Sequence, residues 1–132
     1  MMHAPVSRTE CGAALDELLV GALRCWRRAR DRRAAVQHCL YQMLDPQDQG
    51  MLAPVFDSLM TLFEAALDRP IRAGDPESRS DDERLLLGLL NGKHIRRACI
   101  NCPEGAGSSL DCALCSTRIL LALHDPGERS AI

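Results

Sequence analysis

Four of the seven cysteines lie in one short stretch, CINCPEGAGSSLDCALC, which covers residues 99–115. They form two CxxC pairs separated by nine residues, at Cys99, Cys102, Cys112 and Cys115. A structural zinc site takes four such thiolates in a tetrahedron, with Zn–S distances of about 2.3 Å. Each CxxC turn supplies two sulfurs, and a spacer rich in glycine and serine can fold back without a core of its own. The spacing therefore predicts a zinc ion bound by these four cysteines.

The spacer is shorter than the roughly 15–20 residues common in zinc ribbons. Its length is similar to that of the compact zinc knuckle inserted in some methionyl-tRNA synthetases. This resemblance covers only residues 99–115 and implies a zinc site without synthetase activity. His94 is a substitute ligand if one of the cysteines is not used.

The residues around the cysteines favour thiolates. We expect Asp111 to cap the last helix, which would place Cys112 and Cys115 in its first turn. Free amide N–H groups at a helix start lower the pKa of a thiol. A zinc ion held by four thiolates carries net negative charge, and three nearby cations would offset it: Lys93, Arg96 and Arg97.

Three other interpretations of the two pairs stay open. A dithiol–disulfide switch is one, although thioredoxin-like proteins carry a single CxxC on a βαβ fold. Rubredoxin-type iron turns usually read CxxCG, whereas Pro103 and Ser116 follow these pairs. Ordinary cysteine is the third. The other three cysteines, Cys11, Cys25 and Cys39, are expected to be small buried hydrophobic residues.

An Arg-rich stretch, RCWRRARDRR, is the second functional candidate. Arginine binds phosphate well, and an aromatic ring can stack on bases, so this stretch predicts a nucleic-acid contact. The residues concerned are Arg24, Trp26, Arg27, Arg28, Arg30, Arg32 and Arg33. Against this, the calculated pI is 6.1. Residues 34–83 carry a net charge of −7, so these acids are an alternative partner for the same arginines.

The composition favours an all-α fold. The chain has 132 residues, enough for one domain with a real core, and 46% of them are hydrophobic. Aromatic residues make up only 3%, and leucine far outnumbers isoleucine and valine, so helices packed on helices are expected. No run of apolar residues long enough to span a bilayer and no signal peptide is recognised. A reducing cytoplasmic location is therefore expected, where seven cysteines would stay free of disulfides.

Apolar spacing predicts four to five helices. The first is expected after an N-cap at Thr9, and the second ends before Asp45. Whether these two form one bent helix or two, divided near Asp31, stays open. A third follows i, i+3, i+4, i+7 spacing over residues 52–67, and Ser80 with Glu83 matches a capping box for the fourth. The last is expected from Asp111 to Pro126.

We therefore expect a single all-α bundle over residues 1–132, with a CxxC-x9-CxxC loop at 99–115 before the last helix and a flexible tail at 126–132. The predicted function is a zinc-stabilised binding or regulatory module, with a transcriptional regulator that uses the Arg-rich stretch as one form of it. A thiol-based redox or metal sensor is the alternative. A closed four-thiolate site leaves no position for substrate, so an enzyme is not favoured, and no catalytic residue is assigned. A protein partner or a homodimer is expected, and no membrane contact.

Overall fold

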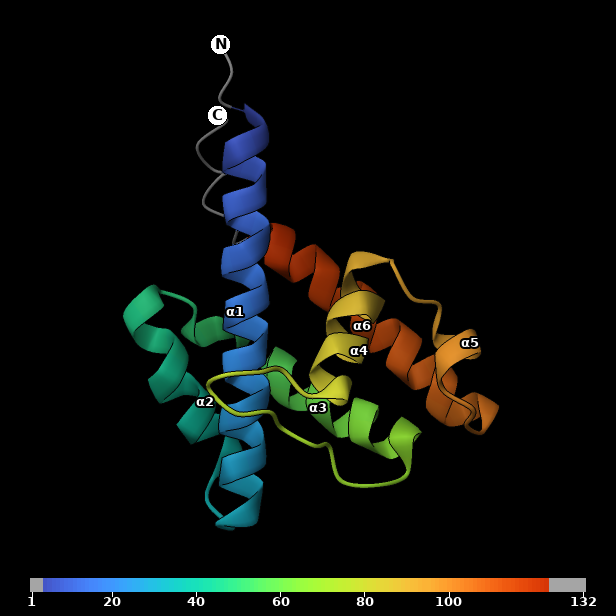
Figure 1. Ribbon diagram of the computed structural model, residues 1–132. Coiled ribbons are helices and arrows are strands. Elements are labelled where there is room, and N and C mark those ends of the chain that lie inside the picture. The colour runs from blue at the N-terminus through green and yellow to red at the C-terminus, as the bar shows by residue number, and fades with distance from the viewer. Residues whose placement is uncertain (1–3, 124–132) are drawn as a thin grey trace.

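The computed structural model describes residues 4–123 of the chain, and the side chains of residues 12–123. Within this range the fold is all-α, as predicted, with six α-helices, two short 3-10 helices and no strand (Figure 1). One isolated bridge joins Asp75 and Ser78 in the connection before the fourth helix.

The first two predicted segments are separate helices. Helix α1 (Ala4–Asp31) begins before the expected cap, so Thr9 lies inside it. It ends at Asp31, and Arg33 follows in a left-handed conformation with φ of 55°. Helix α2 (Val36–Leu44) then packs back against α1. The two predicted segments are therefore two helices, divided by a turn at residues 32–33 just after Asp31.

The middle of the chain follows its sequence pattern closely. Two 3-10 helices, η1 (Asp45–Gln47) and η2 (Gly50–Leu52), lead into α3 (Ala53–Leu67). Helix α4 (Asp81–Asn91) begins with the predicted capping box: the Ser80 side chain accepts from the Glu83 amide, and the Glu83 carboxylate accepts from the Ser80 amide.

The cysteine-rich stretch is largely helical. Helix α5 (Arg96–Cys99) is a single turn, and α6 (Glu104–Leu123) begins seven residues before the expected start at Asp111. The predicted loop at 99–115 is therefore confined to residues 100–103. Tertiary packing explains the difference, because Leu110 is fully buried and anchors the weakly helical segment against the core. The expected tail, 126–132, lies outside the described residues.

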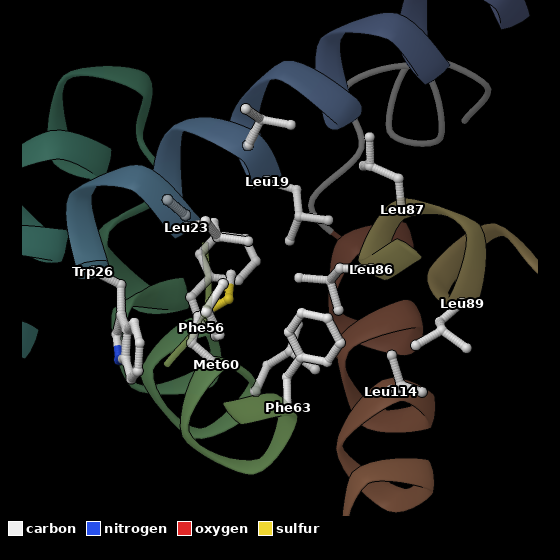
Figure 2. Close-up of a cluster of buried hydrophobic side chains, with 14 of the residues drawn as sticks. Leu19, Leu23, Trp26, Phe56, Met60, Phe63, Leu86, Leu87, Leu89 and Leu114 are labelled. Atoms are coloured by element: carbon white, nitrogen blue, oxygen red, sulfur yellow. The ribbon is translucent and has the colours of Figure 1, made fainter. Parts of the chain in front are cut away.

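One hydrophobic core joins α1, α2, α3, α4 and α6. Helix α6 packs chiefly against α3, while α1 crosses both α2 and α3. The three largest fully buried side chains are Trp26, Phe56 and Phe63. Figure 2 shows them among the leucines contributed by α1, α4 and α6. In Figure 1, α5 lies on the side of the molecule away from α2. The cysteine-rich stretch begins there, because Cys99 is the last residue of α5.

Two segments of the described chain are long and apolar enough to cross a membrane by length and composition, Gly50–Leu67 and Glu104–Leu123. Buried residues make up 44% of the first, which includes the core helix α3. In the second the share is only 22%. Helix α6 thus combines an apolar composition with a large uncovered surface.

Candidate functional site

Three of the four clustered cysteines are at the protein surface. Cys99 is the last residue of α5, and Cys112 and Cys115 lie in α6; all three are exposed. Cys102, in the connection between the two helices, is half-buried against the core. All four are free thiols. The interpretation as ordinary cysteines covered buried and exposed thiols alike, so the exposure of three of the four does not decide against it.

The helical spacer separates the two pairs. At about 1.5 Å of rise per residue, Cys112 lies roughly 12 Å and Cys115 roughly 16 Å along the axis from the first residue of α6. Sulfurs that share a zinc ion lie only about 3.8 Å apart. Accordingly, among residues 12–123 no group of three or more His, Cys, Asp or Glu side chains is placed to hold a metal ion. The structure does not bring the four predicted ligands together.

The two cysteines of the second pair lie close together on one helix. Cys112 and Cys115 are three residues apart on α6, so their side chains leave the same side of the helix. Cys112 also lines an open groove between α3 and α6, together with Ser58 and Ser109. These two thiols are neighbours at the surface without any change in the fold.

Asp111 does not cap a helix. It lies inside α6 and accepts two hydrogen bonds from the Arg96 guanidinium: Nε to Oδ1 at 3.1 Å and Nη2 to Oδ2 at 2.9 Å. The hydrogen bonds from Arg96 lower the pKa of the Asp111 carboxyl. Because Cys112 and Cys115 are in the helix interior, their own amides are not the free N–H groups that were expected to lower the thiol pKa.

Arg96 is the residue at this end of the molecule whose role was not recognised from the sequence. Its side chain is only 6% exposed and lies against the backbone of Gly107, where any Cβ would collide with the guanidinium. The other expected cations differ in environment. Arg97 is exposed and pairs with Glu104 at 3.4 Å, and Lys93 is exposed. Arg96 therefore fastens α5 to α6, and its charge is already balanced by Asp111.

His94, the predicted substitute ligand, serves a packing role in the structure. Its ring covers Gly88 of α4 so closely that a Cβ at that glycine would overlap the ring. Its backbone amide donates to the Gly88 carbonyl at 3.0 Å. These contacts tie the segment after α4 back onto that helix.

The Arg-rich stretch is partly used inside the molecule. Arg24 pairs with Glu83, and both Arg27 and Arg30 pair with Glu64. These acids belong to residues 34–83, the negatively charged middle of the chain. Three of the six arginines are therefore paired with acids within the molecule, which is the alternative to a nucleic-acid contact. The remaining three, Arg28, Arg32 and Arg33, are exposed at the end of α1 and in the turn that follows.

Trp26 is fully buried and cannot stack on a base in this structure. Its indole N–H donates to Asp57 Oδ1 at 2.9 Å, and the Arg30 guanidinium lies 4.9 Å from the ring centroid. The ring is therefore covered by the protein's own side chains. Of the residues predicted to contact nucleic acid, only the three exposed arginines that have no acidic partner among the described side chains remain as candidates, without an aromatic ring to stack on a base.

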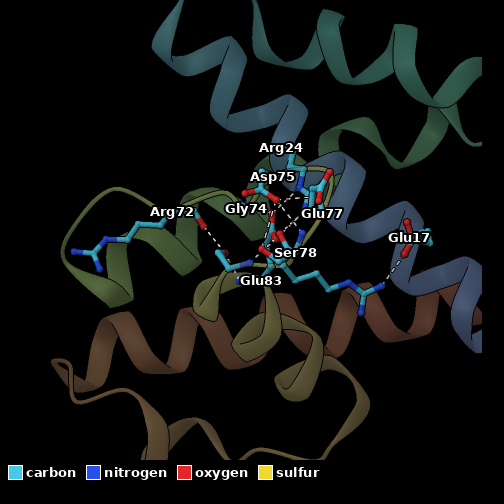
Figure 3. Close-up of polar contacts among 10 residues, drawn as sticks. Glu17, Arg24, Arg72, Gly74, Asp75, Glu77, Ser78 and Glu83 are labelled. Carbon is cyan, nitrogen blue, oxygen red and sulfur yellow. Dashed lines mark hydrogen bonds and ion pairs between the residues drawn. The ribbon is translucent and has the colours of Figure 1, made fainter.

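Two buried carboxylates, Asp82 and Glu83, are adjacent in sequence at the start of α4, and only the capping-box role of Glu83 was predicted from the sequence. Asp82 accepts two hydrogen bonds from Arg69 and one from the Arg72 amide. Glu83 accepts from Arg24, the Gly74 amide and the Ser80 amide (Figure 3). Burial alone would raise the pKa of Glu83, but these hydrogen bonds outweigh it, and the pKa lies below its usual range. Every acceptor is satisfied internally, which indicates a structural role.

Two of the three remaining cysteines lie where α1 meets α2. Cys25 and Cys39 are both half-buried, and Cys25 packs against the core. Burial raises the pKa of the Cys25 thiol, and the neighbouring Cys39 adds to the effect. Cys11, the third, has its side chain outside the described residues.

The architecture is that of a small all-α domain with a cysteine-rich surface at one end. Comparison with protein families, with curated proteins and with solved structures finds no match to this chain. The function of this chain is therefore inferred from its own residues.

Proposed function

We propose that the chain is a small helical regulatory module that binds zinc through the cysteines of residues 99–115. The observation that carries the proposal is the exposure of Cys99, Cys112 and Cys115. Free cysteine is among the most buried residue types when it has no chemical role. Paired thiols at a surface are instead typical of ligands or redox groups.

Zinc is the preferred ion because soft thiolates select it, together with copper(I) and iron–sulfur clusters. Four thiolates around zinc close the coordination sphere, so the proposed role is binding and regulation, not catalysis. A reducing compartment such as the cytoplasm would keep these thiols available, and we propose that location.

The test is metal analysis of protein purified in reductant and without chelator. We expect bound zinc and protection of the ligating thiols from a thiol reagent until a chelator removes the metal. Cys112→Ser should lower the zinc content, whereas Cys39→Ser, a half-buried cysteine outside the stretch, is the matched control and should retain it. A metal-free protein that takes up no added zinc would refute the proposal.

A thiol-based redox sensor is the second candidate, and the exposed neighbours Cys112 and Cys115 favour it. Hydrogen peroxide would oxidise the two thiols to one disulfide, and the two hydrogens lost from sulfur would leave with the peroxide oxygens as two waters. Peptide mapping after peroxide treatment of metal-free protein would identify the pair. A Cys112–Cys115 disulfide in protein that binds no zinc would favour the sensor over the zinc module.

A further inference from the structure

Helix α6 has an exposed face with no cover in the described structure. Ser108, Cys112, Cys115, Ile119 and Leu123 are all exposed, and their spacing of three or four residues places them on one stripe. The side chains of Ile119 and Leu123 are large and apolar, yet those residues are 56% and 63% exposed. Such a stripe on a helix of low overall burial is typical of a contact surface.

The two thiols at the centre of this stripe are half of a zinc site. A tetrahedral ion needs four donors, and the stripe offers two. Among the described side chains, no third His, Cys, Asp or Glu is placed to join them. Cys99 and Cys102 lie before α6, and its first two turns separate them from the second pair. Without unwinding those turns, the two missing donors must come from another molecule.

We propose that a second copy of this chain supplies them, with two α6 helices packed antiparallel across a two-fold axis. The inference rests on the proposed zinc binding. If the axis passes between residues 113 and 114, Cys112 of each copy faces Cys115 of the other. Four thiolates then converge on one point, and the interface uses the same surface patch on both chains, as a two-fold symmetric dimer requires.

The stripe is also complementary to itself in this orientation. Its first half carries small residues, Gly105 and Ser108, and its second half carries Ile119 and Leu123. Antiparallel packing places Ile119 opposite Ser108 of the second copy, and Leu123 opposite Glu104 of the second copy, beside Gly105. The space around Gly105 is open, since a Cβ added there would meet no atom within 4 Å. The large side chain of Ile119 thus packs onto the small Ser108 on both sides of the zinc ion, once from each copy.

A membrane is the other occupant that an apolar helix face could take. Two thiols form the centre of this stripe, and Asp111 and Arg118 are exposed on the same helix. Charged side chains such as these are costly in hydrocarbon, whereas a second copy completes the coordination of the two thiols. The second copy therefore accounts for the stripe better than a membrane does, and binding to lipid vesicles separates the two.

The test is the mass of the reduced protein in solution, measured by light scattering with and without added zinc chloride. We expect a monomer without zinc and a dimer with one zinc per two chains. Cys112→Ser and Cys115→Ser should each abolish dimerisation, while Cys99→Ser and Cys102→Ser should leave it intact. Ile119→Asp should weaken the dimer roughly ten-fold or more, because it removes apolar contact and adds charge. Ile95→Asp is the matched control, since Ile95 is exposed outside α6.

Three results would overturn the inference. Zinc bound at one per chain to a monomer, with loss of binding in Cys99→Ser, would show ligation within one chain and would leave the proposed function standing. Binding of the zinc-loaded monomer to phosphatidylglycerol vesicles, abolished by Ile119→Asp, would assign the stripe to a membrane. Failure to bind zinc at all, with every variant folded by circular dichroism, would refute the inference and the proposed function together.

Discussion

Arg24 and Glu83 are 59 residues apart in the sequence and form an ion pair with two hydrogen bonds, Nε to Oε2 at 2.9 Å and Nη2 to Oε1 at 3.1 Å. The Glu83 side chain has no exposed surface, and it also accepts from the Gly74 and Ser80 amides. One carboxylate therefore connects α1, the segment before α4, and α4 itself (Figure 3).

Arg24→Ala should destabilise the fold by about 2–4 kcal/mol, because it leaves the Glu83 carboxylate buried without its cation. Urea unfolding followed by circular dichroism measures the change. Arg84→Ala is the matched control: its partner Asp81 and Arg84 itself are both well exposed, so the expected loss is below about 0.5 kcal/mol. Equal losses in the two variants would contradict the structural role of the Arg24–Glu83 pair.

Stability should fall in acid because of Asp82 and Glu83. Burial raises the pKa of each carboxyl, but hydrogen bonds from Arg69 and the Arg72 amide to Asp82, and from Arg24 and two amides to Glu83, bring both pKa values below their usual range. The folded state therefore binds these protons more weakly than the unfolded state. Their contribution is complete above the unfolded pKa values of about 4 and is lost as pH falls through the lower folded values.

Urea unfolding at pH 7, 5, 4 and 3 tests this expectation. These two groups should change the urea concentration at the unfolding midpoint little between pH 7 and pH 5. At pH values below 4 that concentration should decrease. Glu83→Gln should show a shallower acid-dependent drop, since it removes one of the two titrating groups. A drop of the same steepness in that variant would assign the acid sensitivity to other carboxylates.

Gly74→Ala should be strongly destabilising. A Cβ at this position would lie 2.5 Å from the Ser78 carbonyl oxygen and 2.7 Å from both the Ser80 nitrogen and Glu83 Oε1. Backbone would have to move, and the hydrogen bonds of the buried carboxylate would be lost with it. Thermal unfolding measures the effect. Gly12→Ala is the control, because no atom lies near a Cβ there and alanine favours the helix by up to about 1 kcal/mol.

Thiol reagents should distinguish the cysteines by rate. Cys99, Cys112 and Cys115 are exposed and should be labelled rapidly in metal-free protein. Cys25 should react slowly, since its thiol is half-buried and burial raises its pKa, which lowers the thiolate fraction. Mass spectrometry of peptides after brief iodoacetamide treatment measures the rates. In urea the four should react alike, and rapid labelling of Cys25 in the folded protein would contradict its observed burial.

Local sequence signals predicted much of the fold. The apolar repeat of α3 and the Ser80 capping box both act within a few residues, so the pattern indicates them directly. The start of α6 was predicted wrongly because the contacts that stabilise it involve residues outside this segment. Glycine and serine predict a loop between Pro103 and Leu110, but burial of Leu110 and the bond from Arg96 to Asp111 favour a helix.

The same distinction applies to the candidate sites. The four cysteines were found from their spacing, but the distance between the pairs depends on the helix that separates them. Arg24, Arg27 and Arg30 resembled a nucleic-acid surface because Glu64 and Glu83, their acidic partners on other helices, are 34 or more residues away. Of the three, Arg27 also pairs with Asp31 on its own helix. Charge patterns identify which residues are present, and only packing shows which of them have already found a partner.

Trp26 is the single tryptophan of the chain, and it is buried where α1 meets Asp57 of α3. Its fluorescence therefore reports on the junction of those two helices. Emission should stay constant when zinc or an oxidant acts on the surface of α6, and should shift only when the core itself opens. The protein thus carries an internal optical reference that separates events at its thiols from unfolding.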